Sequence, residues 1–261
     1  MKINVINPNT TATMTAKIRE AAVAVAAPGT EILAATPETG PVSIEGHYDE
    51  AVSVIGLLQE IRKGEAQGVD GTVIACFGDP GLYAAREAAK GPVLGIAEAA
   101  MHVASFIATG FSIVTTLART EVIAHHLVAR YGMTPFCRGI HSTELAVLDL
   151  EDEASDARRI ILEECRRALR DDRSGAILLG CAGMADLTAA LERELGVPVI
   201  DGVAAAVKLV EALVGLGIST CKVGDFAYPI VKPYVGSMAS MAPSDEARIE
   251  PPQRKAAGAT G

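Results

Sequence analysis

The sequence has no tryptophan, few other aromatic residues, and no long apolar run. Hydrophobic residues make up 49% of the 261 positions, but aromatic residues make up only 4%. A membrane-spanning helix needs about 20 consecutive apolar residues, and no run reaches about 18, so we expect no membrane partner. Asn7 and Pro8 interrupt the first apolar run too early for a secretory signal. The sequence therefore predicts a cytoplasmic protein.

Motifs for cofactors and metals are also missing. The chain contains no G-x-x-x-x-G-K-[ST] loop, no G-x-G-x-x-G after its first predicted strand, and no H-E-x-x-H. Its five cysteines include no C-x-x-C pair, which leaves zinc and thioredoxin-like sites without support. The net charge of −9 argues against a nucleic-acid partner, because the phosphate backbone is bound by basic surfaces. We expect a small-molecule substrate and no cofactor.

Short apolar runs alternate with helical stretches, which is typical of parallel α/β proteins. Predicted strands cover 2–6, 31–35, 71–75, 93–96, 111–115, 136–140, 176–180 and 199–200, and predicted helices cover 11–27, 49–64, 97–108, 121–131, 154–171 and 203–216. Residues 36–48 are rich in proline, glycine and polar residues, so we expect a loop there. Asp79 and Pro80 predict the N-cap and first position of one more helix.

The second half of the chain repeats landmarks of the first. DGTVIACFGDPGL at 70–82 aligns with SGAILLGCAGMADL at 174–187, cysteine on cysteine, and GPVLGIAEAAMHVA at 91–104 aligns with VPVIDGVAAAVKLV at 197–210. Cys181 follows Cys76 by 105 positions, and the second proline-valine pair follows the first by 106. The sequence therefore predicts a doubled α/β unit.

Cys76 and Cys181 stand at matched positions of this repeat. Each ends a predicted buried strand and precedes a glycine by two positions. Ligands of parallel sheets bind beyond the carboxyl ends of strands, and glycine lets backbone N–H groups approach an anion there. A following helix N-terminus adds positive charge. We therefore expect thiol pKa values below about 8.5 and general acid–base roles. The other cysteines, Cys137, Cys165 and Cys221, are predicted to be structural.

A doubled unit has a chemical consequence. Pseudo-twofold symmetry can place two similar acid–base groups on opposite faces of one carbon atom. Racemisation needs this arrangement, because one group removes a proton and the other donates a proton from the far side. Backbone N–H donors can stabilise the enolate-like intermediate.

Four segments together resemble the hydantoin/allantoin racemase branch of the aspartate/glutamate racemase superfamily. They are INPNT at 6–10, ACFGDPGL at 75–82, IVTTLART at 113–120 and LGCAGM at 179–184. The resemblance spans about residues 3 to 235. It implies two similar three-layer α/β domains with parallel sheets, related by a pseudo-twofold, and an active site in the cleft between them. The domains would be 1–96 plus 208–236, and 97–207, followed by a tail at 237–261.

The resemblance also implies site residues. Cys76 and Cys181 would be the acid–base pair of a cofactor-independent, two-base mechanism, and Gly78 and Gly183 would supply N–H donors beside them. Asn9 and Thr116 would face the substrate after the first strand of each domain. Ile44 or Val42, in the loop 36–46, would cover its ring. Phe77 and Ala182 replace polar residues of the amino-acid racemases, which favours a neutral cyclic ureide. Members of the family generally form homo-oligomers.

Several functions stay open at this point. The substrate is either a 5-substituted hydantoin or allantoin. An amino-acid racemase or a maleate-type cis–trans isomerase on the same scaffold is an alternative. A small-molecule binding module is the alternative that is not an enzyme, but two equivalent thiols would have no purpose in it. Asp79 is better explained as a helix cap than as a second base.

Overall fold

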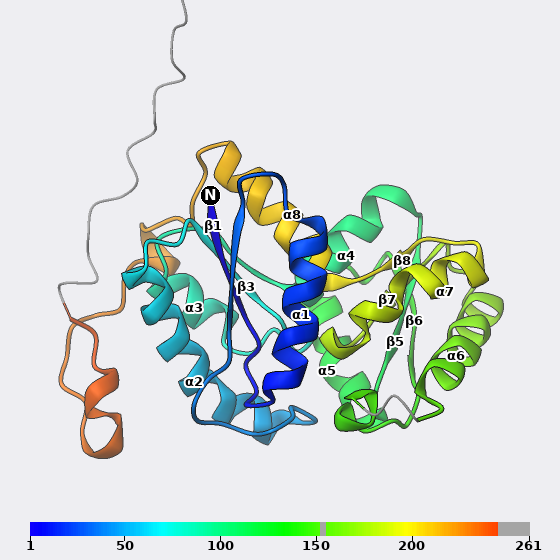
Figure 1. Cartoon of the computed structure of the whole chain (residues 1–261), viewed down its shortest axis with the longest axis horizontal. Helices are drawn as coiled ribbons and strands as arrows, with labels where there is room; N and C mark the ends of the chain where they lie inside the picture. The colour runs from blue at the N-terminus through cyan, green and yellow to red at the C-terminus, as the bar shows by residue number, and fades with distance from the viewer. Residues whose placement is uncertain (152–154, 245–261) are drawn as a thin grey trace, which may run out of the picture.

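Eight parallel strands form two four-stranded sheets in the computed structural model, which describes residues 1–151 and 155–244 (Figure 1). The first sheet has the order β2-β1-β3-β4, and the second has the order β6-β5-β7-β8. The strands are β1 (Lys2–Ile6), β2 (Glu31–Ala35), β3 (Gly71–Ile74), β4 (Val93–Gly95), β5 (Phe111–Thr115), β6 (Cys137–Ser142), β7 (Ala176–Leu179) and β8 (Val199–Ile200). The identical order confirms two similar α/β domains, and β3 and β7 are equivalent strands.

Helices connect the strands and cover the sheets. The α-helices are α1 (Ala12–Val25), α2 (His47–Ala66), α3 (Leu82–Ala88), α4 (Ile96–Ile107), α5 (Ala118–Arg130), α6 (Ala157–Asp172), α7 (Thr188–Leu195) and α8 (Gly202–Gly215). Short 3₁₀ helices are η1 (Val147–Glu151), η2 (Ala182–Leu187), η3 (Gly224–Phe226) and η4 (Gly236–Met241). None of the helices within the described residues combines the length and apolar character needed to cross a membrane.

One hydrophobic core joins the two sheets. It contains Ile3 of β1 and Phe111 of β5 together with Ala104 of α4 and Val207 of α8, all fully buried. Helices α4 and α8 pack on each other between the sheets (Figure 1). Their closest approach depends on Gly202, because a Cβ atom there would lie 2.6 Å from the carbonyl oxygen of Ile96. The small alanine side chains of the two helices allow this close packing.

The structure corrects several predicted elements. Helix α3 begins at Leu82 behind Gly81, so Asp79 does not cap it, and the side chain of Asp79 instead accepts from the N–H groups of Ala97 and Glu98 at the start of α4. Helix α7 was not predicted. Residue 154 of the predicted helix 154–171 lies outside the described residues, as do residues 245–261 of the predicted tail.

Candidate active site

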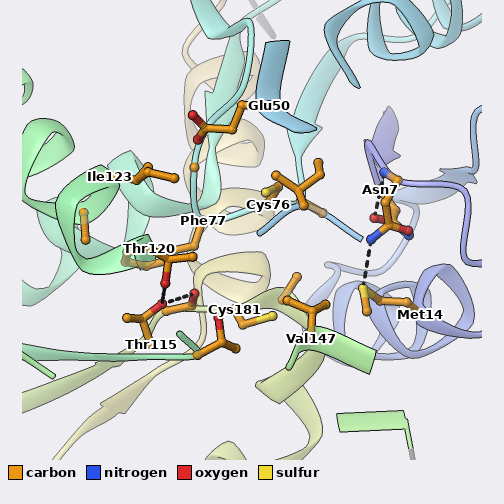
Figure 2. A pocket seen from close by; sticks show the side chains of 18 residues that line it. Asn7, Met14, Glu50, Cys76, Phe77, Thr115, Thr120, Ile123, Val147 and Cys181 are labelled. Carbon is orange, nitrogen blue, oxygen red and sulfur yellow. Dashed lines mark hydrogen bonds between the residues drawn. The ribbon is translucent and has the colours of Figure 1, made fainter. Parts of the chain in front are cut away.

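A pocket of about 50 Å³ lies at the carboxyl ends of the central strands of both sheets (Figure 2). Asn7 follows β1, Cys76 follows β3 by two positions, Thr115 ends β5, and Cys181 follows β7 by two positions, and all four line the pocket. Parallel strands bring their carboxyl ends to one edge, so residues far apart in sequence meet here.

The two thiols face the pocket from different sheets. Figure 2 shows Cys76 and Cys181 on opposite sides of the space. Both are free thiols, and each remains partly accessible. The backbone N–H of Gly78 donates to the Cys76 sulfur, and that of Gly183 donates to the Cys181 sulfur. Matched groups therefore surround one small space from two sides.

Burial controls the acidity of both thiols. It raises the pKa of Cys181 to about 11 and raises the pKa of Cys76 further, while the Gly78 and Gly183 N–H groups offset only part of the effect. The expectation of lowered pKa values was wrong, because removal of water from the thiolates outweighs one N–H donor each. A thiolate formed in this pocket is consequently a strong base.

Two buried asparagines organise the turn after β1. The Asn7 side-chain amide donates to Oδ1 of Asn9 at 2.8 Å, and Nδ2 of Asn9 contacts the sulfur of Met14 at 3.2 Å. Oδ1 of Asn9 also accepts from the N–H of Thr11 at 2.9 Å. These contacts hold the turn beside the pocket, where Figure 2 shows Asn7 and Met14.

The equivalent turn after β5 is held by threonines. The Thr115 hydroxyl lies 3.0 Å from that of Thr120 and 3.2 Å from the carbonyl oxygen of Gly180. A Cβ atom on Gly180 would lie 2.7 Å from Cβ of Thr115, so this close approach of β5 and β7 requires glycine. Thr116 is 2% exposed and lines the pocket beside them.

The structure brings together nearly all the predicted site residues. Those that line the pocket are Asn9, Ile44, Cys76, Phe77, Gly78, Thr116, Cys181 and Ala182. Gly183 does not line the pocket, but its backbone N–H donates to the sulfur of Cys181, which does. Of the two residues predicted to cover the substrate, Ile44 lines the pocket, whereas Val42 is 58% exposed and does not. Sequence reasoning missed Asn7, Met14, Glu50, Thr120, Ile123 and Val147.

The loop 36–46 is joined to the second sheet's domain across the pocket. A carboxylate oxygen of Glu45 accepts a 2.8 Å hydrogen bond from the N–H of Val147 at the start of η1. Ile44 and Val147 both line the pocket beside this contact. Lys17 of α1 also pairs with Glu151 at the end of η1, at 3.3 Å. Segments of both domains therefore close over the thiols.

Titratable clusters outside the pocket have other partners. His141 of β6 lies 2.7 Å from Asp172 and 3.3 Å from Glu164, on the α6 side of the second sheet. Glu98 pairs with Arg86 beside β4. Within the ranges 1–151 and 155–244, no group of three or more His, Cys, Asp or Glu side chains is arranged to hold a metal ion.

Comparison with known proteins agrees with this architecture. A family model for Asp/Glu/hydantoin racemase matches residues 3–210. A hydantoin racemase of Rhizobium meliloti is 52% identical over 236 residues, or 90% of this chain and 98% of the relative. The solved allantoin racemase from Klebsiella pneumoniae has a TM-score of 0.92 at 59% identity, covering 94% of this chain and 100% of that chain. A glutamate racemase from Francisella tularensis subsp. tularensis SCHU S4, at 15% identity and a TM-score of 0.60, covers 85% of this chain and 84% of its own, and shares the fold.

Proposed function

The chain belongs to the Asp/Glu/hydantoin racemase family and is a racemase, and on this basis we propose that it inverts C5 of 5-substituted hydantoins or of allantoin. The proposed mechanism is cofactor-independent and uses Cys76 and Cys181 as two bases. The observation that carries it is the placement of these thiols on opposite sides of one pocket, at equivalent strand ends (Figure 2).

The proton transfers balance between the two thiols. The thiolate of one cysteine takes the proton from C5, and the electron pair of the C–H bond delocalises into the neighbouring ring carbonyl. The thiol of the other cysteine then donates its proton to the opposite face of C5. The product is the other enantiomer, and the two cysteines have exchanged protonation states, so the reverse reaction uses the same groups in opposite roles.

The pocket walls support this chemistry. A developing enolate is stabilised by fixed dipoles where water is excluded. The thiol pKa values are raised by burial, which makes each thiolate basic enough to remove a weakly acidic C–H proton. Phe77 and Ala182 follow the two cysteines directly and present no charge, as suits a neutral cyclic ureide. Asn9 and Thr116 are proposed to contact the ring, and Ile44 to cover it.

We propose that the domains are 1–96 with 208–236, and 97–207. The packing of α8 against α1, β3 and β4 supports return of the chain to the first domain. A homo-oligomer and a cytoplasmic location remain predictions.

Single alanine substitutions at the five cysteines test the mechanism. Enantiopure substrate is mixed with each variant in D₂O, and optical rotation and deuterium at C5 are followed. Cys76→Ala and Cys181→Ala should each lose racemisation by about 10²–10⁴-fold or more, because general acid–base groups contribute on this scale. Cys137→Ala, Cys165→Ala and Cys221→Ala are the matched controls and should stay active. Near-normal racemisation by Cys76→Ala or Cys181→Ala would overturn the two-base mechanism.

A further inference from the structure

The start of helix α4 is capped by a side chain that lies far back in the chain. The N-cap position of α4 is Gly95, which has no side chain to offer. Asp79 supplies the cap instead, because its carboxylate accepts from the N–H groups of Ala97 at 3.1 Å and Glu98 at 2.9 Å. These are the second and third N–H groups of the helix, which an N-cap side chain normally satisfies.

The equivalent helix beside the second sheet has a local cap. Helix α8 follows β8 as α4 follows β4, and its own N-cap residue is Asp201. The Asp201 carboxylate accepts from the N–H groups of Val203 at 3.0 Å and Ala204 at 2.9 Å. The same two bonds can thus be made from the start of the helix, and capping alone does not explain why α4 receives them from Asp79.

The distant cap imposes two constraints on the chain. Asp79 has a backbone φ of 45°, in the left-handed region that residues with a Cβ atom rarely adopt. Position 95 has to be glycine, because a Cβ atom there would overlap the carboxylate carbon of Asp79. Backbone strain of this kind persists where surrounding contacts fix it, and it is concentrated at functional sites. The strain therefore points to a role for Asp79 at the nearby thiol.

Asp79 belongs to the turn that carries Cys76, residues 76–79, which we call the Cys76 turn. The N–H of Asp79 donates to the carbonyl oxygen of Cys76 at 3.0 Å, and the N–H of Gly78 donates to the Cys76 sulfur. Tyr131, at the end of α5, donates its hydroxyl to the Asp79 carboxylate at 2.7 Å. This buried carboxylate therefore ties the Cys76 turn to both α4 and α5.

The turn at the second thiol is held differently. The N–H of Met184 donates to the carbonyl oxygen of Cys181 at 3.1 Å, so the two turns share this backbone hydrogen bond. Met184 takes the place of Asp79, and its fully buried side chain has no oxygen with which to accept from a helix N-terminus. The pseudo-twofold is therefore broken at one side chain beside the thiols.

We propose that Asp79 is a positioning residue for Cys76, and that its contacts with α4 and Tyr131 fix this thiol against the substrate. Cys181 is placed independently of these contacts. Asp79 does not line the pocket, so it acts through Cys76 and does not touch the substrate. The inference rests on the proposed function, because it needs each thiol to remove a proton from C5.

Variants with one pocket thiol measure each base separately. Cys181→Ser retains Cys76, and Cys76→Ser retains Cys181, and each is followed by deuterium uptake at C5 of the enantiomer that it exchanges in D₂O. Asp79→Asn is then added to both. It keeps the shape of the side chain, but an amide has one oxygen and cannot accept all three hydrogen bonds.

The loss should be confined to one base. In Cys181→Ser, we expect Asp79→Asn to lower kcat for exchange by about 10–100-fold with little change in KM, because a misplacement of about 1 Å can cost 10²-fold. In Cys76→Ser, the rate should change little. Rates are compared per folded protein, measured by circular dichroism, so that a loss of stability is not counted as a loss of rate.

Two further variants separate positioning from folding. Tyr131→Phe retains the carboxylate and should give a smaller loss, again in Cys181→Ser only, and it decides the question if Asp79→Asn does not fold. Asp201→Asn removes the matching cap of α8 and is the control. It should leave the ratio of the two exchange rates unchanged.

Two results would overturn the proposal. An equal loss in both single-thiol variants would show that Asp79 supports the fold as a whole. An unchanged rate in Cys181→Ser would show that the distant cap does not place Cys76. Failure of the proposed function looks different, because the single-thiol variants would then exchange no deuterium before Asp79 is changed, and the proposal would fall with it.

Discussion

The hydroxyl of Tyr131 donates a 2.7 Å hydrogen bond to the buried carboxylate of Asp79. Tyr131 follows α5, next to the second sheet, whereas Asp79 lies three positions after Cys76 in the first domain. The same carboxylate accepts from the N–H groups of Ala97 and Glu98, at 3.1 and 2.9 Å. One side chain therefore connects the Cys76 turn, the start of α4 and the end of α5.

Removal of the Tyr131 hydroxyl should destabilise the fold. In Tyr131→Phe, the Asp79 carboxylate loses one of its donors in a place that water does not reach. We expect a loss of about 1–3 kcal/mol in the free energy of unfolding, measured by urea denaturation. Tyr83→Phe is the control, because the Tyr83 ring is nearly half-exposed. Equal stability of Tyr131→Phe and the wild type would contradict this view of the contact.

Asp79 should also make stability depend on pH. Burial raises its pKa from 3.8 to about 7, so the folded chain binds a proton that the unfolded chain releases between these values. The stabilising contribution is complete below about pH 4 and is lost as the pH rises through about 7. Asp79→Asn has no such titration. We expect the free energy of unfolding of the wild type minus that of Asp79→Asn, measured by urea denaturation, to fall between about pH 4 and about pH 8. A difference that stays constant over this range would contradict the titration of Asp79.

The same residue shows the limits of local sequence signals. An aspartate followed by proline is a standard helix start, and the prediction placed Asp79 at the N-cap of the next helix. In the structure its backbone has a positive φ of 45°, and its side chain turns to α4 instead. The local preference was overridden by a contact with a helix that begins seventeen residues later, which no local pattern records.

The site was predictable where it follows the repeat. Cys76 and Cys181 stand two positions beyond β3 and β7, the equivalent strands of the two sheets, and the resemblance to the racemases implied that these strand ends share one cleft. Glu50 and Val147 carried no such signal, because they reach the pocket from a helix and a 3₁₀ segment whose packing is tertiary. The direction of the thiol pKa shifts was missed for the same reason. It depends on how completely these distant segments exclude water.

The pH dependence of activity follows from the thiols. Burial raises the pKa of Cys181 to about 11 and that of Cys76 further, so at neutral pH only a small fraction of either thiol is ionised. The thiolate population grows as the pH rises. We expect kcat/KM to increase by about tenfold per pH unit between about pH 7 and 9 for both enantiomers. A plateau that begins near neutral pH would show that the thiols ionise more readily in the working enzyme.

A side chain at Gly180 should destabilise the fold, because β5 and β7 approach each other closely there. A Cβ atom there would meet Cβ and Cα of Thr115 at 2.7 and 2.9 Å, and the backbone of a central strand cannot move aside easily. Gly180→Ala should cost about 1–3 kcal/mol or more in the free energy of unfolding. Gly215→Ala, at the end of α8 with nothing within 4 Å, should be neutral or stabilising by up to about 1 kcal/mol. Equal effects of the two substitutions in thermal or urea denaturation would contradict this.

The two thiols should serve opposite enantiomers. A serine at either position keeps the shape of the side chain, but a hydroxyl is a far weaker acid than a thiol and cannot replace it. The remaining thiolate can still remove the C5 proton from the enantiomer that presents it on that face, and return a deuteron from D₂O to the same face. Cys76→Ser and Cys181→Ser should therefore each exchange one enantiomer without inversion, and the two variants should prefer opposite enantiomers.

Deuterium uptake into each pure enantiomer, followed by NMR alongside optical rotation, measures this preference. Cys221→Ser is the matched control, because its thiol is exposed and outside the pocket, and it should exchange and invert both enantiomers. Exchange of the same enantiomer by both pocket variants would contradict one thiol per face. A single base, with a substrate that turns over in the pocket, would then explain racemisation better than the symmetry of the two sheets does.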